Sequence, residues 1–164
     1  MDTLKAFKYF YSEHVVDKGR EVPFRILLAF LITFIIARLT VYSIMNALLP
    51  SMFLFVNGTH IHHLNYGIFL LSVSGYFALT LAKNEKWIHR ISIVYGVGLG
   101  LTFDEFGMWL HLRDDYWMRH SYDAVIIVAI LLLNGILFGR LWMNYCSHCI
   151  KSMMKKEKEY GNKT

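Results

Sequence analysis

Asp104 and Glu105 are adjacent carboxylates inside residues 91–112, a stretch that is otherwise apolar enough to cross a bilayer. An ionised side chain at the centre of a membrane costs about 3 kcal/mol on insertion scales. Such groups therefore face a protein interior, a partner group or water, and they often mark functional sites. A buried carboxylate can also act as a general base. Asp104 and Glu105 are thus candidate catalytic residues, with Glu105 as the base.

Histidines and further carboxylates lie near both ends of the apolar stretches, including the run His-Ile-His-His at 60–63. Imidazole and carboxylate together suit Zn, Fe or Mn, and helical bundles hold such ions between facing helices. An ion with an open coordination position could activate water or dioxygen for chemistry on a lipid or another membrane-embedded substrate. The candidate metal ligands are His60, His63, His111, Asp104, Asp115 and Asp123.

Two other interpretations use the same residues. Intramembrane carboxylates and histidine can pass protons or a cation, so Asp104, Glu105 and His111 could form a relay with Arg38 as counter-ion. Alternatively, Arg38 neutralises one of the acids, and the buried ion pair fixes the register of the helices in a structural or accessory subunit. The residue types alone leave these alternatives open, and they leave open whether the protein is an enzyme.

The composition and the lengths of the apolar runs predict the helices that would position these residues. The 164-residue chain is 55% hydrophobic and only 18% charged, and its charges fall in blocks between apolar runs. Four runs are long enough to span about 30 Å of hydrocarbon at 1.5 Å per residue. The sequence predicts an all-α fold, a single membrane domain built as a four-helix bundle with spans at 24–49, 59–82, 91–112 and 123–143.

The basic residues predict the orientation of this bundle. They concentrate in the N-terminal segment, between the second and third runs, and in the tail at 144–164, whereas residues 50–58 contain no Lys or Arg. The positive-inside rule therefore predicts a protein of the cell membrane with both termini on the cytoplasmic side. The connections after the first and third spans would lie on the outer side. Helical spacing of apolar residues within 1–22 predicts a short amphipathic helix in the cytoplasmic interface.

Helical periodicity then groups the candidate site residues. On one continuous helix Asp104, His111 and Asp115 share a stripe, beside a row of glycines that would let a neighbouring helix approach closely. A second helix that begins near Thr59 would place His60 and His63 on one face. The rise of a straight helix would put His60, His63 and His111 at a similar depth, near the outer face of the membrane.

The rise of a straight helix puts Arg38 level with the two acids, at about 20 Å from the cytoplasmic ends of their spans. Glu105 points about 100° away from Asp104 around the helix. We therefore expect Asp104 to face the histidines and Glu105 to face Arg38.

The motifs Asp104-Glu105-Phe106-Gly107, Tyr116-Trp117, His62-His63 and Tyr66-Gly67 resemble those of a set of small polytopic prokaryotic membrane proteins. The resemblance implies an inner-membrane location and no particular activity. The expected partners are the lipid bilayer and a lipid or small hydrophobic substrate, and a homo-oligomer stays open. Because topology accounts for the net charge of +5, nucleic-acid binding is not expected.

Overall fold

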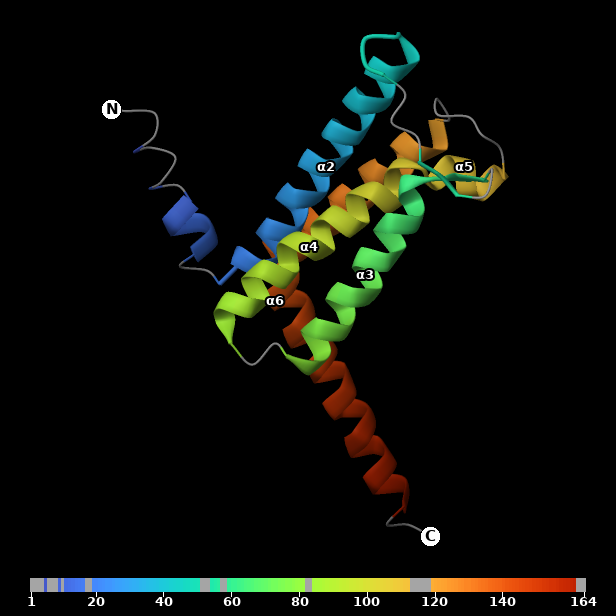
Figure 1. The fold of residues 1–164 in the computed structure, drawn as a ribbon. Coiled ribbons are helices and arrows are strands. Elements are labelled where there is room, and N and C mark those ends of the chain that lie inside the picture. The colour runs from blue at the N-terminus through green and yellow to red at the C-terminus, as the bar shows by residue number, and fades with distance from the viewer. Residues whose placement is uncertain are drawn as a thin grey trace.

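The computed structural model describes residues 5, 9, 11–16, 19–50, 54–56, 59–81, 84–112 and 119–161. Within these residues the fold is helical, with one short β-hairpin (Figure 1). The elements in chain order are the π-helix η1 (Ser12–Val16), α2 (Glu21–Met45), β1 (Leu54–Val56), β2 (Thr59–Ile61), α3 (His63–Thr80), α4 (Glu85–Asp104), α5 (Phe106–His111) and α6 (Arg119–Gly161).

Helix α4 is the central element, because it packs along α2 on one side and α3 on the other. Small residues make this close packing possible. A Cβ atom built on Gly96 would lie 2.5 Å from the carbonyl oxygen of Ile26 in α2. One built on Gly67 of α3 would lie 2.7 Å from the backbone nitrogen of Thr102 in α4. Gly96 and Gly100, which the sequence indicates as a packing edge, both face α2, whereas Gly98 faces α3.

Helix α6 crosses the same bundle and then leaves it. Its first part contacts α2, α4 and α5, whereas its C-terminal part extends well beyond the other helices (Figure 1). At 43 residues and 1.5 Å per residue it is about 64 Å long. The apolar run predicted at 123–143 is thus only the middle of a longer helix.

The helices alternate in direction, so α2 and α4 end where α3 and α6 begin. We call this end of the bundle the polar end, because Arg38, His63 and Asp104 all lie there. The predicted levels of Arg38 and Asp104 are consistent with this arrangement, since the two side chains are in contact.

The prediction that the second helix begins near Thr59 is wrong. Residues Thr59–Ile61 form β2, which pairs antiparallel with β1 so that Phe55 faces His60 and Val56 faces Thr59. Helix α3 begins only at His63, with His62 in extended conformation as its N-cap. A hairpin satisfies its backbone groups by strand pairing, which hydrophobicity over a long window does not distinguish from helix.

The prediction of one helix over 91–112 is also wrong. Helix α4 ends at Asp104, Glu105 has φ −101° and ψ 11°, and the chain resumes as the six-residue α5. Helix α5 ends in turn at Leu112, whose φ of 51° lies in the left-handed region. The break separates Asp104 from His111, so these two residues of the predicted stripe do not share one helical face, and Asp115 lies outside the described residues.

The N-terminal region is described only in part: it contains η1 over Ser12–Val16, and the interfacial position predicted for residues 1–22 stays a prediction. The ring of Tyr11 lies edge-on to Phe24 of α2, with 5.5 Å between their centroids. The buried Val15 accepts a backbone hydrogen bond from Arg20. This segment therefore rests against the start of α2.

The helices carry many exposed apolar side chains for so small a protein. Two helical segments are long and apolar enough to cross a membrane: α2 over Glu21–Met45 and the 29-residue part His120–His148 of α6. Leu79 of α3 and Leu39 of α2 are 91% and 60% exposed. Only a few large side chains, such as Phe30, are fully buried among the described residues.

Candidate functional site

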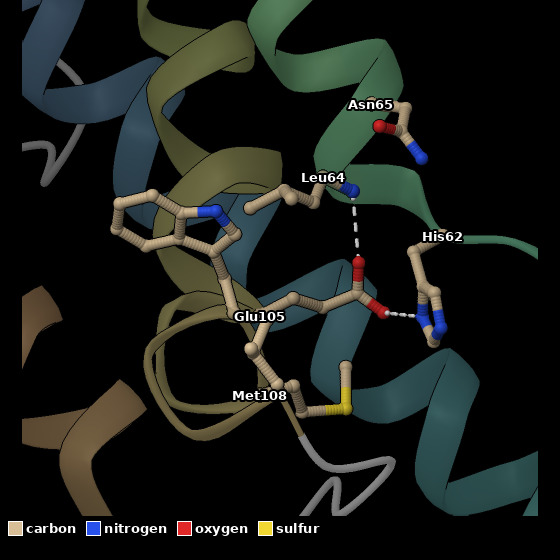
Figure 2. Close-up of a pocket in the computed structure, with 7 residues that line it drawn as sticks. His62, Leu64, Asn65, Glu105 and Met108 are labelled. Carbon is tan, nitrogen blue, oxygen red and sulfur yellow. Dashed lines mark hydrogen bonds and ion pairs between the residues drawn. The ribbon is translucent and has the colours of Figure 1, made fainter.

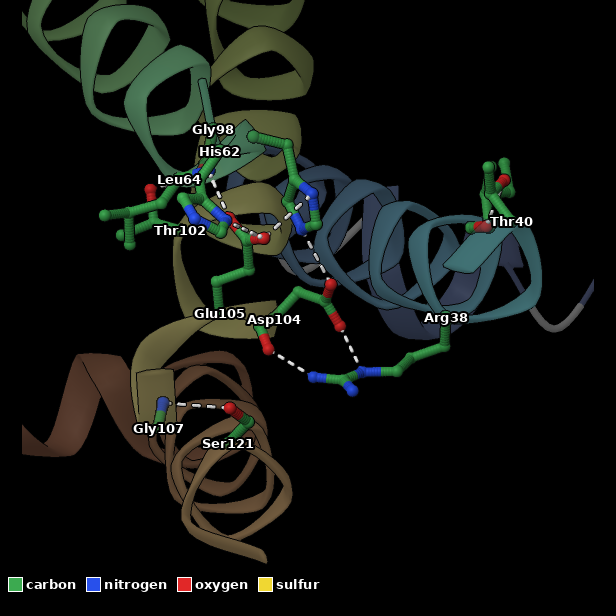
Figure 3. Close-up of polar contacts among 12 residues, drawn as sticks. Arg38, Thr40, His62, Leu64, Gly98, Thr102, Asp104, Glu105, Gly107 and Ser121 are labelled. Carbon is green, nitrogen blue, oxygen red and sulfur yellow. Dashed lines mark hydrogen bonds and ion pairs between the residues drawn. The ribbon is translucent and has the colours of Figure 1, made fainter. Parts of the chain in front are cut away.

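The centre of the polar end is an ion pair between α2 and α4. The guanidinium Nε of Arg38 pairs with Oδ1 of Asp104, and its Nη2 donates to the Asp104 carbonyl oxygen (Figure 3). The Asp104 side chain is only 1% exposed. This carbonyl belongs to the last turn of α4, where helical carbonyls lack intrahelical partners. Arg38 thus neutralises a buried acid and caps the end of its helix.

Aromatic rings cover the same guanidinium. Its central carbon lies 4.8 Å from the ring centroid of Tyr122 in α6 and 5.7 Å from that of Phe34 in α2. Cations are attracted to aromatic faces at such distances. Helices α2, α4 and α6 therefore meet around one charged group.

His63, the first residue of α3, connects the two acids. Its Nε2 lies 2.7 Å from Oδ2 of Asp104, and its Nδ1 lies 3.4 Å from Oε1 of Glu105. Both ring nitrogens of this half-buried side chain therefore face carboxylates.

Glu105 sits in the break between α4 and α5 and reaches the start of α3. Its Oε2 accepts a hydrogen bond from the backbone N–H of Leu64 at 2.8 Å, and its Oε1 lies 3.0 Å from Nδ1 of His62 (Figure 2). The N-cap residue His62 makes no capping hydrogen bond with its own side chain. Glu105 takes over that role from a distant part of the chain, with its negative charge at the positive end of the α3 dipole.

The start of α5 is capped in a similar way. The backbone N–H of Gly107 donates to Oγ of Ser121 in α6 at 2.9 Å, and Ser121 is 1% exposed (Figure 3). Side chains from other elements thus satisfy the helix ends exposed by the break. Unsatisfied backbone groups in an apolar setting are costly, so these contacts make the break possible.

A pocket of about 320 Å³ opens beside Glu105. Its lining combines the polar side chains of His62 and Asn65 with apolar ones from α3 and α5 (Figure 2). The apolar lining residues are Leu64, Met108, Trp109 and Leu112. Glu105 is 2% exposed, whereas His62 is 30% exposed. The imidazole of His62 is therefore the member of the network that a ligand in this pocket would meet.

The partners of the two acids agree only in part with the expectation from a continuous helix. Asp104 contacts Arg38, whereas Glu105 contacts His62 and caps α3. Only the contact of Asp104 with a histidine, His63, agrees with the expected arrangement. The helix break is the physical reason, because it changes the direction of the Glu105 side chain relative to α4.

The remaining predicted metal ligands lie elsewhere or outside the described residues. His111 contacts His120 rather than the acids. Asp123 lies near the start of α6. Asp115 and the side chain of His60 are outside the described residues. Among the side chains that the structure describes, no group of three or more His, Cys, Asp or Glu is arranged to hold a metal ion.

Sequence reasoning missed His62, Ser121 and Tyr122 as parts of this site. On a helix starting at Thr59, His62 points away from His63, so the helical wheel excluded it. The adjacent His62-His63 pair was the available signal, because neighbouring residues at a strand-to-helix junction can both face one site.

Comparisons with known proteins identify no relative of this chain. No family model, curated protein or solved structure matches the chain.

Proposed function

We propose that this protein is a multi-pass membrane protein whose His62–Glu105 centre binds the polar head of a membrane amphiphile and exchanges a proton with it. The polar end lies at the outer face of the membrane, with both termini in the cytoplasm. The amphiphile is a lipid or a similarly small hydrophobic molecule. The proposal has a membrane part and a chemical part, and each can be tested alone.

Helix length and exposed apolar surface support the membrane part. Besides α2 and α6, α3 and α4 have 18 and 20 residues, which corresponds to about 27 and 30 Å at 1.5 Å per residue. These lengths match the hydrocarbon core of a bilayer. Exposed side chains such as Leu39, Leu79 and Leu131 would contact lipid tails rather than water. We therefore infer four spans: α2, α3, α4 and α6.

The position of His62 carries the chemical part. It is a part-exposed histidine of a buried charge network, and unlike His63 it lines an otherwise largely apolar pocket. A carboxylate that holds Nδ1–H of a histidine selects the tautomer whose Nε2 can take up a proton. Glu105 would orient His62 in this way, and the apolar walls of the pocket suit the chain of an amphiphile.

His63 has a different role in this proposal. Because its two nitrogens face Asp104 and Glu105, it holds the acids together rather than meeting a ligand. Binding of a Zn, Fe or Mn ion by His63 and the two acids is less favoured, because the ion would have to displace the contacts of His63 with Asp104 and Glu105.

A structural role is the second candidate, and one observation favours it. Arg38, Glu105 and Ser121 each satisfy the end of another helix. A network that only fixes the helices would need no pocket. Translocation along α4 is less favoured, because glycine contacts close the space between α2, α4 and α3 below the network.

The test uses full-length protein in nanodiscs with a phosphatidylethanolamine that carries a photoreactive diazirine in its headgroup. We expect crosslinks on Asn65, Met108 or Trp109, and we expect His62→Ala to reduce them at least fivefold. Glu105→Gln should also reduce them, because the amide oxygen can still accept from Leu64 but the negative charge that orients His62 is lost.

His89→Ala is the matched control. His89 also bonds a glutamate, with its Nε2 3.0 Å from Oε2 of Glu21, but at the opposite end of the bundle. Its crosslinking pattern should equal that of the wild type. Equal labelling of the pocket in His62→Ala and wild type would refute the chemical part and leave the structural role.

A further inference from the structure

His111 and His120 form a second polar cluster at the polar end, separate from the acid network. His111 ends α5, and His120 lies in the first turn of α6. Nε2 of His111 lies 3.3 Å from Nδ1 of His120, and the ring centroids are 4.7 Å apart at an interplanar angle of 52°. Both side chains are exposed, so a solvent ion can reach them.

This spacing fits the bite of a tetrahedral metal ion. Zinc binds imidazole nitrogen at about 2.0–2.1 Å, so two nitrogens at the tetrahedral angle lie about 3.3 to 3.4 Å apart. The observed separation of 3.3 Å therefore matches the distance between two imidazole nitrogens on one zinc ion. The same separation exceeds the usual range of an N–H hydrogen bond, so the direct contact stabilises little by itself.

We propose that His111 and His120 together bind one divalent transition-metal ion of the zinc class. Neutral imidazole is the protein ligand common to Zn, Cu and Ni, and two histidines from different elements act as a chelate. Asp123 follows His120 by three residues and so lies on the same face of α6, where its charge favours a nearby cation. Water would complete the coordination, because the described side chains place no third His, Cys, Asp or Glu ligand in a group with this pair.

The ion would join α5 to the start of α6. The hydrogen bond from Gly107 to Ser121 already links these elements at the other end of α5. Helix α5 supplies Met108 and Trp109 to the wall of the pocket. The ion would thus hold that wall in place, although its binding does not depend on the proposed function of the pocket.

The test is a titration of full-length, tag-free protein in nanodiscs with Cu²⁺, followed by electron paramagnetic resonance. We expect one equivalent to bind with hyperfine splitting from two imidazole nitrogens, and Zn²⁺ in excess to displace it. His111→Ala and His120→Ala should each weaken Cu²⁺ binding at least tenfold, which is the scale of loss for altered metal shells. Because both side chains are exposed, neither substitution should unfold the protein.

Two controls separate this site from the other histidines. His148→Ala removes an exposed histidine near the far end of α6, and His62→Ala removes one from the acid network. Both variants should keep the two-nitrogen signal. The proposal is overturned if wild type binds no stoichiometric Cu²⁺, if either His111 or His120 is dispensable, or if His62→Ala abolishes the signal.

Discussion

Arg38 combines three interactions that usually require separate residues: an ion pair with Asp104, a cap on the last turn of α4, and contact with two aromatic rings. Its side chain is 12% exposed, so the planar guanidinium is shielded on its faces while its edge bonds the acid. Lysine could not reproduce this arrangement, because its ammonium lacks the two-nitrogen edge that reaches carboxylate and carbonyl together.

Arg38→Ala should therefore destabilise the protein strongly. Removing one partner of a buried ion pair typically costs about 3–5 kcal/mol, because the other charge stays buried without compensation. Reversible unfolding in mixed micelles measures this loss. Arg90→Ala is the control, since Arg90 is an exposed cation over Trp87 and should cost less than about 1 kcal/mol.

The double variant Arg38→Met with Asp104→Asn distinguishes charge from packing. Neutralising both partners removes the uncompensated charge, so the double variant should be more stable than Arg38→Ala alone. Equal stability of the two would mean that the guanidinium contributes mainly through its contacts with Phe34 and Tyr122.

At the scale of elements, glycine decides how closely α3 and α4 approach. A Cβ on Gly67 would lie 2.4 Å from Oγ1 of Thr102, well inside contact distance. A Cβ on Gly75, in the same helix, would meet nothing within 4 Å. These two positions share a helix and a residue type but differ in what faces them.

Gly67→Ala should thus destabilise the protein by about 1–3 kcal/mol through overpacking. Gly75→Ala should instead be neutral or stabilise it by up to about 1 kcal/mol, because alanine favours helix over glycine. Parallel unfolding curves of the two variants provide the measurement. A similar loss for both would show that α3 and α4 do not pack through Gly67.

The break between α4 and α5 also belongs to this scale. The sequence predicts one helix because residues 91–112 are uniformly apolar apart from the acids. The chain instead breaks at Glu105, where Arg38 of α2 bonds the last carbonyl of α4 and Ser121 of α6 bonds a backbone N–H at the start of α5. Each of these partners is 14 or more residues away in sequence, so no local pattern contains the information.

The whole molecule must place its polar end on one side of the membrane for the proposed site to meet an outer-leaflet ligand. Ala47, just after α2, and Asn84, the N-cap of α4, lie at opposite ends of the bundle. In a variant with Cys146 and Cys149 replaced by Ser, Ala47→Cys should react with a membrane-impermeant maleimide in intact cells. Asn84→Cys should react only after permeabilisation, because basic residues near it favour the cytoplasm.

Labelling of Asn84→Cys but not Ala47→Cys in intact cells would show the opposite orientation in the membrane. Labelling of both positions in intact cells would contradict a four-span protein. Ala47 lies beyond the end of α2 and Asn84 lies before the start of α4, so failure to label one position despite permeabilisation points to burial in an assembly. A separate Leu49→Cys variant, two residues after Ala47, tests whether the lack of labelling is specific to one buried position.

The sequence by itself determined the helical class, the four apolar runs that overlap α2, α3, α4 and α6, and the level at which Arg38 and Asp104 meet. Composition and hydrophobic length specify these features because they depend on local free energies of burial and helix formation. Only the tertiary structure decided the strand pairing before α3, the break at Glu105, the contact of His62 with Glu105, and which acid meets Arg38. The physical reason is that a break or cap is stable only when distant groups satisfy the backbone, and those contacts exist only after the helices have packed.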